Sequence, residues 1–269
     1  MKKGHMTIEG SQIYYESSGK GEPLIFIHAD TLDLRQWKRQ VDYFSNHYKV
    51  IAFDIRGFGK SDIPHSKEYS FAGDLHYLMN ELRVNKAHIV GLSLGGAIAI
   101  DFALIHPDML LSLTLADSGI EGDTFAQRFL DEISKIIIVA KEGDLDLARR
   151  KWLNLDILSF SRTIPDVWRE VKQMVTDTSC YRWFGQNQPV TQTPDAANRL
   201  HEIKVPTLIL VGEYDIDDFQ RKSKLLNDNI SGSKFATISM AGHLSNMDNP
   251  VRFNEELSVF LNSVKSKSE

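Results

Sequence analysis

The sequence predicts an α/β domain that is built on a mostly parallel sheet, with helices on both faces and a helical insertion. Short runs rich in Val, Ile and Leu alternate with longer amphipathic stretches, as is typical of parallel strands covered on both faces. Residues 121–200 break this alternation with several helical patterns that have no strand between them. The length of 269 residues fits one large domain with such an insertion.

The expected strands begin with a hairpin, in which Gly10-Ser11 separates two short β-rich runs. Apolar runs of the length of a buried strand follow further along the chain. They lie at residues 24–27, 50–53, 88–90, 111–115, 207–211 and 235–239. Their repeated alternation with helical patterns predicts a doubly wound parallel sheet.

Helices are expected where apolar residues recur at helical spacing. In the main part of the chain they cover residues 34–46 and 71–82, a stretch directly after Ser93, and a last helix that begins at Pro250 and is capped by Asn249. In the insertion, one helix is marked by Phe125, Phe129, Ile133, Ile136 and Ile137, and weaker patterns cover 147–153, 165–175 and 178–184. We therefore divide the chain into a core domain, residues 1–120 and 201–269, and a helical cap, residues 121–200.

Composition and charge exclude several classes of protein. A hydrophobic content of 42% and a charged content of 25% are those of an ordinary globular chain. The formal net charge of -5, without a basic stripe, gives no reason to expect nucleic acid or an anionic membrane as partner. Cys180 is the single cysteine, so we expect no intrachain disulfide and no metal site. No signal peptide or membrane-spanning stretch is visible, and we expect a cytoplasmic protein.

A candidate nucleophile lies in Gly91-Leu92-Ser93-Leu94-Gly95, which matches the pattern G-x-S-x-G. A strand is expected directly before it and a helix directly after it. This context places the serine on a sharp turn, where its neighbours must be small and where the helix N-terminus lends partial positive charge. The alternative is a glycine-rich turn with an incidental serine. The flanking strand and helix favour the nucleophile.

A serine hydroxyl needs a base to take its proton and an acid to orient that base. With this type of turn, the acid and then the histidine follow the serine along the chain. Asp215 comes at the end of a late strand and is our candidate acid; Asp217 and Asp218 are alternatives that also suit the start of a helix, and Asp117 is a further one. Of the nine histidines, only His243 follows Asp215, and it is our candidate base.

These motifs resemble those of the α/β-hydrolase superfamily, and the resemblance covers nearly the whole chain. Residues 54–61 resemble its D-x-R-G-x-G-x-S loop, and residues 242–250 resemble its C-terminal histidine block. The capped enzymes for small substrates are most similar in style, among them carboxylesterases, 3-oxoadipate enol-lactonases, cofactor-free perhydrolases and meta-cleavage C–C hydrolases. The resemblance implies an eight-stranded, mostly parallel sheet with a helical cap, and neither a metal nor an organic cofactor.

The loop expected to complete the oxyanion hole departs from the family pattern. The family usually has His-Gly here, whereas this chain has His28-Ala29-Asp30. The backbone N–H groups of Leu94 and Asp30 are the expected oxyanion donors. The Asp30 carboxylate either faces the site, where it opposes a developing oxyanion, or caps the segment before Leu34. We expect the capping role, and a structural role for His28.

Aromatic residues gather in the predicted cap, which holds Trp152, Trp168 and Trp183. They either line an apolar substrate site or hold the cap on the core. Ala29, Trp152 and Trp183 are our candidate substrate-binding residues, and a small apolar acyl or aryl group is the expected ligand. Arg56, Arg162 and Arg182 are further candidates for binding a carboxylate.

The leading hypothesis is hydrolysis of a small carboxylic ester or lactone through an acyl-serine intermediate, by a monomer or homodimer. A C–C bond hydrolase or a perhydrolase with the same three residues is the near alternative. A hydrolase-like sensor of small molecules, with little turnover, is the alternative from another class, and the unusual Ala29-Asp30 pair gives it some weight.

Overall fold

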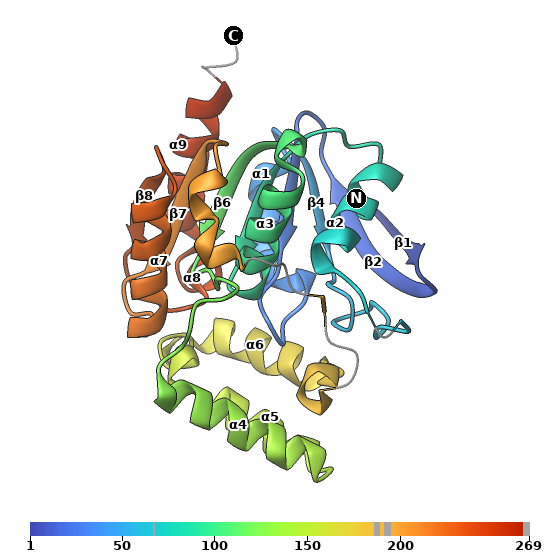
Figure 1. Cartoon of the computed structure of the whole chain (residues 1–269), viewed down its shortest axis with the longest axis vertical. Coiled ribbons are helices and arrows are strands. Elements are labelled where there is room, and N and C mark those ends of the chain that lie inside the picture. The colour runs from blue at the N-terminus through green and yellow to red at the C-terminus, as the bar shows by residue number, and fades with distance from the viewer. Residues whose placement is uncertain (67, 186–188, 191–194, 266–269) are drawn as a thin grey trace.

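The computed structural model describes residues 1–66, 68–185, 189–190 and 195–265, and within them one eight-stranded sheet forms the centre of the molecule (Figure 1). The strand order across the sheet is β1-β2-β4-β3-β5-β6-β7-β8. The strands are β1 Lys2–Ile8, β2 Ser11–Ser18, β3 Pro23–Ile27, β4 Lys49–Phe53, β5 Ala87–Leu92, β6 Leu110–Ala116, β7 Thr207–Gly212 and β8 Lys234–Ile238.

The pairing of the strands confirms a mostly parallel sheet. The hairpin of β1 and β2 is antiparallel, and β2 also runs antiparallel to β4. The remaining strands, from β4 across to β8, pair in parallel. Because parallel strands end at the same edge of a sheet, the loops that follow β3, β5, β6 and β7 gather at one edge.

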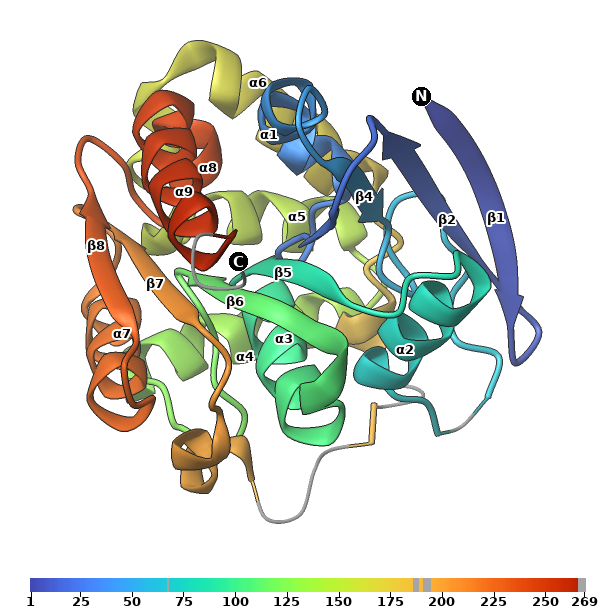
Figure 2. The same cartoon turned by 90° about the horizontal axis from the view of Figure 1, so that it is seen from above.

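Helices cover both faces of the sheet, as expected (Figure 2). On one face lie α2 Phe71–Glu81, α3 Leu94–Ile105 and α7 Asp217–Asn229, and on the other α1 Lys38–Phe44, α8 Ser245–Asp248 and α9 Pro250–Lys265. The expected helix over 34–46 is a 3-10 turn at Leu34–Trp37 followed by α1, which ends at Phe44. The Asn249 side chain accepts a hydrogen bond from the Arg252 amide, which is the expected cap of the last helix.

Between β6 and β7, the described residues form helices and turns but no strand, and the helices lie beyond one end of the sheet (Figure 1). It contains α4 Gln127–Lys141, α5 Leu145–Leu153 and α6 Pro165–Asp177. The predicted helix through Phe125 begins only at Gln127, and the pattern at 178–184 forms a 3-10 turn, Tyr181–Phe184. Other short 3-10 turns lie at Pro107–Met109, Asp156–Leu158, Ser161–Thr163, Ala196–Asn198 and Leu200–Glu202.

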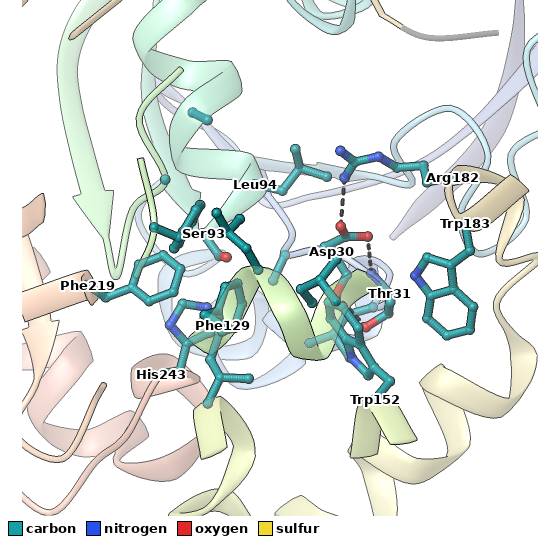
Figure 3. Close-up of a pocket in the computed structure, with 18 of the residues that line it drawn as sticks. Asp30, Thr31, Ser93, Leu94, Phe129, Trp152, Arg182, Trp183, Phe219 and His243 are labelled. Carbon is teal, nitrogen blue, oxygen red and sulfur yellow. Dashed lines mark hydrogen bonds and ion pairs between the residues drawn. The ribbon is translucent and has the colours of Figure 1, made fainter. Parts of the chain in front are cut away.

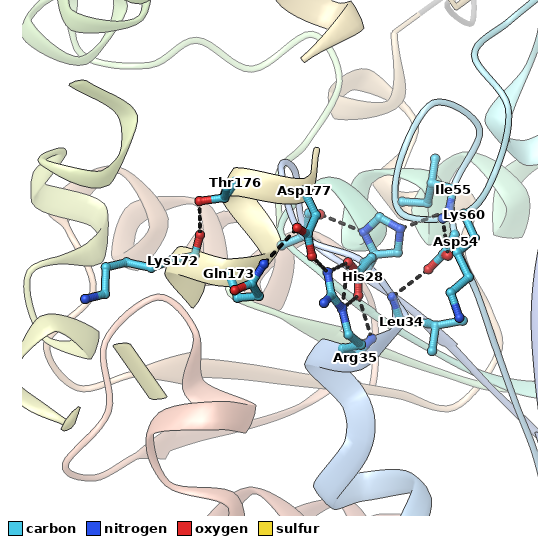
Figure 4. Close-up of polar contacts among 12 residues, drawn as sticks. His28, Leu34, Arg35, Asp54, Ile55, Lys60, Lys172, Gln173, Thr176 and Asp177 are labelled. Carbon is cyan, nitrogen blue, oxygen red and sulfur yellow. Dashed lines mark hydrogen bonds and ion pairs between the residues drawn. The ribbon is translucent and has the colours of Figure 1, made fainter. Parts of the chain in front are cut away.

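Polar contacts join α6 to the main part of the molecule. Arg35, which follows the N-cap residue Asp33, pairs with Asp177 at the end of α6, with 2.8 Å between the charged atoms (Figure 4). Arg39 pairs with Glu170 of the same helix at 2.8 Å. Both pairs are partly exposed, so we expect them to orient α6 more than to stabilise the fold.

The core consists of apolar clusters on the two faces of the sheet. In one cluster Trp37 is fully buried and stacks on Phe26, with 4.7 Å between the ring centroids, and it also contacts Phe253 of α9. Among the described residues, no helix combines the length and the apolar character that crossing a bilayer requires.

Candidate active site

Ser93 lies at the junction of β5 and α3 in a strained backbone conformation, with φ 56° and ψ -112°. A positive φ is uncommon for a residue with a side chain, and it persists only where the surroundings hold it. Here the Ser93 amide donates to the Ala116 carbonyl, and the Ser93 carbonyl accepts from the Gly119 amide, each at 3.0 Å. The half-buried serine is thereby held at the carboxyl edge of the sheet.

The glycines around Ser93 are required by close approach of the backbone. A Cβ atom at Gly91 would overlap the Gly95 carbonyl oxygen, and one at Gly95 would overlap the Ile27 carbonyl oxygen. Helix α3 therefore packs against β3 at a distance that no side chain permits, as the G-x-S-x-G pattern predicts.

Asp215 and His243 form a buried pair beside this turn. The His243 Nδ1 lies 2.8 Å from Asp215 Oδ2, and both side chains are almost fully buried. The other oxygen of Asp215 accepts from the Ile216 amide at 2.8 Å. An ionised Asp215 can only accept a hydrogen bond, so the His243 ring carries its proton on Nδ1 and donates it to Asp215. The lone pair is then on Nε2.

The alternative acids have other partners. Asp217 is exposed at the start of α7, and Asp218 accepts from the Ala126 amide at 2.9 Å. Asp117, however, is fully buried. One of its carboxylate oxygens lies within 4.8 Å of a carboxylate oxygen of Asp215 and of a ring nitrogen of His243. It accepts from the Gly212 amide at 2.7 Å and from the Ser245 hydroxyl.

The neighbouring carboxyls of Asp117 and Asp215 change each other's protonation. Burial raises the pKa of both groups well above the usual carboxyl range, and the charge of Asp215 adds to the effect on Asp117. Because the two carboxyls are buried close together, the charge of one disfavours the charge of the other. Of the described residues these two and His243 form the one cluster of the metal-ligand type, and all four carboxyl oxygens already have hydrogen-bond partners within the protein.

Burial also controls His243. Its desolvated ring has a pKa lowered to about 4, against an ordinary value near 6.5. The imidazole is therefore neutral at pH 7, which is the form that can accept a proton from a serine hydroxyl. Phe219 of α7 packs on the ring with 4.2 Å between centroids and helps to exclude water.

Ser93 and His243 open into one cavity of about 500 Å³, within the range of small-molecule sites (Figure 3). Most of the lining is apolar and comes from the helical segment between β6 and β7. It includes Phe125, Phe129, Ile133, Ile137, Trp152 and Ile157. The arrangement can hold an apolar group beside a nucleophile and a neutral base.

The structure brings Ala29, Asp30 and Leu94 to the same cavity. Ala29 avoids the left-handed backbone that a glycine would allow, and Thr31, with φ 61°, adopts it instead. The Ala29 amide donates to Gln36 Oε1 at 2.9 Å. Leu94 is the first residue of α3, so its amide has no carbonyl one turn earlier to bond with inside the helix.

The ring nitrogens of His28 contact the main chain of the loop after β3 and of the loop after β4 (Figure 4). Its buried ring lies 2.8 Å from the Ala29 carbonyl through Nδ1, and Nε2 accepts from the Ile55 amide at 2.9 Å. Burial lowers the pKa of the ring, so it stays neutral and can donate at one nitrogen while accepting at the other. These contacts fit the structural role expected for His28.

The expected capping role of Asp30 is wrong, because Asp33 is the residue that caps the Leu34–Trp37 turn. The Asp30 carboxylate instead accepts from the Thr31 amide at 2.8 Å and pairs with Arg182 at 2.7 Å. Both charged side chains line the cavity (Figure 3). Sequence reasoning missed this pair, since its members lie 152 residues apart.

The D-x-R-G loop has a structural role. The Asp54 carboxylate accepts from the Leu34 and Lys60 amides, each at 2.8 Å, and burial raises its pKa to about 7 (Figure 4). Arg56 forms two hydrogen bonds with Asp74 and is fully buried. Arg162 donates to main-chain carbonyls. Of the arginines considered for a carboxylate, Arg182 is the one in the cavity lining.

Of the predicted pocket residues, Trp152 and Trp183 both line the cavity, with 5.8 Å between their ring centroids. Trp168 packs against the core cluster and is absent from the described lining. Phe129 and Phe219 were missed as pocket residues. Phe129 belongs to the apolar pattern that predicted α4, but helical spacing alone does not tell which face of a helix meets a ligand.

Comparisons with known proteins agree with this geometry. Residues 22–250 match the family described as alpha/beta hydrolase fold. The chain is 24% identical to 3-oxoadipate enol-lactonase 1 of Acinetobacter baylyi, over 90% of this chain and 89% of that protein. A solved esterase from Thermogutta terrifontis is 25% identical, with a TM-score of 0.80, and the match covers 98% of this chain and 99% of that one.

A further solved structure, of an N-acyl homoserine lactone degrading enzyme, is 27% identical, with a TM-score of 0.77 over 96% of this chain and all of that one. The family match spans the strained serine turn and extends to the start of the last helix. This chain belongs to the alpha/beta hydrolase fold family.

Proposed function

We propose that this protein hydrolyses small carboxylic esters or lactones through an acyl-serine intermediate on Ser93. One observation carries the proposal: a strained serine and His243, whose buried ring pairs with Asp215, face one apolar cavity. No step of the proposed reaction uses a metal or an organic cofactor. The esterase and lactonase names of similar proteins support the choice of bond.

The first half of the reaction acylates the serine. His243 Nε2 takes the proton from Ser93 Oγ as that oxygen attacks the substrate carbonyl carbon. The amides of Leu94 and Asp30 donate to the carbonyl oxygen as it becomes negative, and the N-terminus of α3 adds partial positive charge. His243 then gives the proton to the leaving alkoxide oxygen, and the alcohol departs.

The second half reverses these roles with water. His243 takes a proton from a water molecule, whose oxygen attacks the acyl carbon and regenerates the oxyanion. The proton then passes to Ser93 Oγ as the acid is released. Throughout, Asp215 holds the Nδ1–H and stabilises the imidazolium, which is why its position at the carboxyl end of β7 matters.

The nucleophile is tested with Ser93→Ala. Multiple turnovers on a short-chain aryl ester and labelling by an active-serine phosphonate should both be lost, with a fall of at least about 10³-fold in kcat. Circular dichroism should remain that of the wild type. Unchanged hydrolysis by the folded variant would sink the proposal. Labelling of wild-type Ser93 by the phosphonate without turnover of the ester would favour a sensor. Rates measured on a panel of esters, lactones and diketones separate ester cleavage from C–C bond cleavage.

A further inference from the structure

A partly exposed ion pair forms part of the cavity lining. Asp30 Oδ2 is 2.7 Å from Arg182 Nη1, and both side chains are less than a third exposed, at 28% and 29%. Asp30 stands in the loop that follows β3, directly beside the candidate oxyanion hole, while Arg182 comes from the Tyr181–Phe184 turn. Figure 3 shows the pair between Leu94 and Trp183.

The carboxylate of Asp30 is held in place by a second contact. Its other oxygen accepts from the Thr31 amide at 2.8 Å, and Thr31 adopts the left-handed backbone that makes this bond possible. The surroundings of Arg182 also favour its charged form: although burial opposes the charge, Asp30 and the nearby Tyr181 raise the pKa of the guanidinium above its usual value. Arg182 is therefore charged, and two contacts hold the Asp30 carboxyl group beside it.

The rest of the described lining supplies little additional charge near Ser93. Apart from the pair and His243, its ionisable side chains are Glu121, which is half-buried and also favours the charge of Arg182, and Lys141, which is exposed at the end of α4. The remaining side chains are largely apolar. An arginine in such a pocket would attract the carboxylate of a ligand, because charge attraction is strong where water is scarce. Asp30 already provides that carboxylate.

We propose that Asp30 acts as a built-in carboxylate that occupies Arg182, so that the pocket selects acyl groups with an uncharged end. This inference rests on the proposed function and names its substrate class: esters or lactones of neutral, mainly apolar acids. A ligand carboxylate must either displace Asp30 from Arg182 or lie beside it with its charge uncompensated. Specificity then comes from repulsion as much as from the apolar walls.

The test uses two aryl esters of one short acyl chain, which ends in a carboxylate in the first and in the carboxamide of the same size in the second. For the wild type, kcat/KM should be at least about tenfold higher for the carboxamide. Asp30→Asn keeps an oxygen that can accept from the Thr31 amide but removes the carboxylate that pairs with Arg182. The ratio should therefore shift at least about tenfold toward the carboxylate ester.

Two further variants isolate the cause. In the double variant Asp30→Asn, Arg182→Gln, the shift toward the carboxylate ester should disappear, because the freed cation is gone. Asp33→Asn removes a carboxylate from the same loop that is absent from the described lining. It should leave the ratio of the two esters unchanged, which controls for general effects on the loop.

A binding measurement separates this inference from the proposed function. The N-methylamides of the same two acyl chains contain no ester bond, and their binding can be followed by the fluorescence of Trp152 and Trp183. The wild type should bind the carboxamide form more tightly, and Asp30→Asn should shift the preference at least about tenfold toward the carboxylate form. A wild type that treats both ligands alike, or an Asp30→Asn variant with an unaltered ratio, overturns the inference. Loss of all esterase activity with the binding preference intact overturns only the reaction.

Discussion

At the scale of single residues, burial gives His243 its chemical character. The ring is almost fully buried against Phe219, and its pKa is lowered to about 4. Because the base must be neutral to act, a lowered pKa extends activity toward acid. We expect kcat/KM for a neutral ester to stay constant from pH 8 down past the ordinary histidine value near 6.5.

The pH profile should be measured with an ester whose own ionisation lies outside this range. An acid limb at or above the ordinary histidine value would contradict the expectation. It would show that the charge of Asp215 outweighs the desolvation of the ring. Circular dichroism at each pH separates loss of the base from unfolding.

Single residues also show where sequence reasoning stops. The common location of Ser93, Asp215 and His243 was predictable because each follows a strand, and strand ends meet at one edge of the sheet. Asp30 was placed in the right loop but given the wrong partner. A single sequence has no local pattern that links Asp30 to Arg182, because that contact depends on how a distant turn packs.

At the scale of elements, the contact between β3 and α3 depends on glycine. In Gly95→Ala, the new Cβ would meet the Ile27 carbonyl oxygen, so strand and helix must move apart. We expect the free energy of unfolding to fall by about 1–3 kcal/mol or more, together with a large loss of esterase activity as Ser93 shifts. Urea denaturation and ester assays measure the two effects.

Gly73→Ala is the matched control for this change. Gly73 is exposed near the start of α2, and a Cβ there would meet only the Ser70 side chain, at 3.3 Å. Alanine favours helix, so the free energy of unfolding should change by less than about 1 kcal/mol. Equal destabilisation by both alanines would contradict the account of close packing.

Elements were predictable in proportion to their length and periodicity. The strands and the helices α2, α3 and α9 were located within a few residues, because apolar spacing identifies them. Helix α8, of four residues, and the 3-10 turns are too short to show a period. The Tyr181–Phe184 turn that carries Arg182 is one of these, which is why its direction was not foreseen.

At the scale of the whole molecule, Trp37 joins the beginning and the end of the chain. It packs between Phe26 of β3 and Phe253 of α9 and is fully buried. Trp37→Ala should lower the free energy of unfolding by about 3–5 kcal/mol, because a large cavity replaces the ring. Chemical denaturation followed by circular dichroism measures the loss.

Trp37→Phe tests whether packing alone explains that loss. The indole nitrogen has no hydrogen-bond partner among the described residues, so phenylalanine removes volume without removing a bond. Trp37→Phe should lower the free energy of unfolding clearly less than Trp37→Ala does. Trp152→Ala, at the half-buried cavity wall, should also cost less than Trp37→Ala. Similar losses in all three variants would refute a special role for Trp37.

The overall fold was the most predictable level, because alternation of strands and helices leaves few arrangements that bury both faces of a sheet. The volume and charge of the cavity were the least predictable. They depend on which faces of α4 and α5 turn inward, and amphipathic helices pack with more than one choice of neighbour.

The insertion between β6 and β7 has a consequence for how such a protein can change over generations. Ser93 precedes the inserted helices in the chain, whereas Asp215 and His243 follow them, so the proposed reacting groups lie in segments different from those that form most of the cavity wall. Mutations in the helices can therefore alter which ligands the cavity accepts without changing the proposed catalytic residues. Arg182 is the exception, since a substitution there would leave Asp30 of the main part of the molecule without its ion-pair partner.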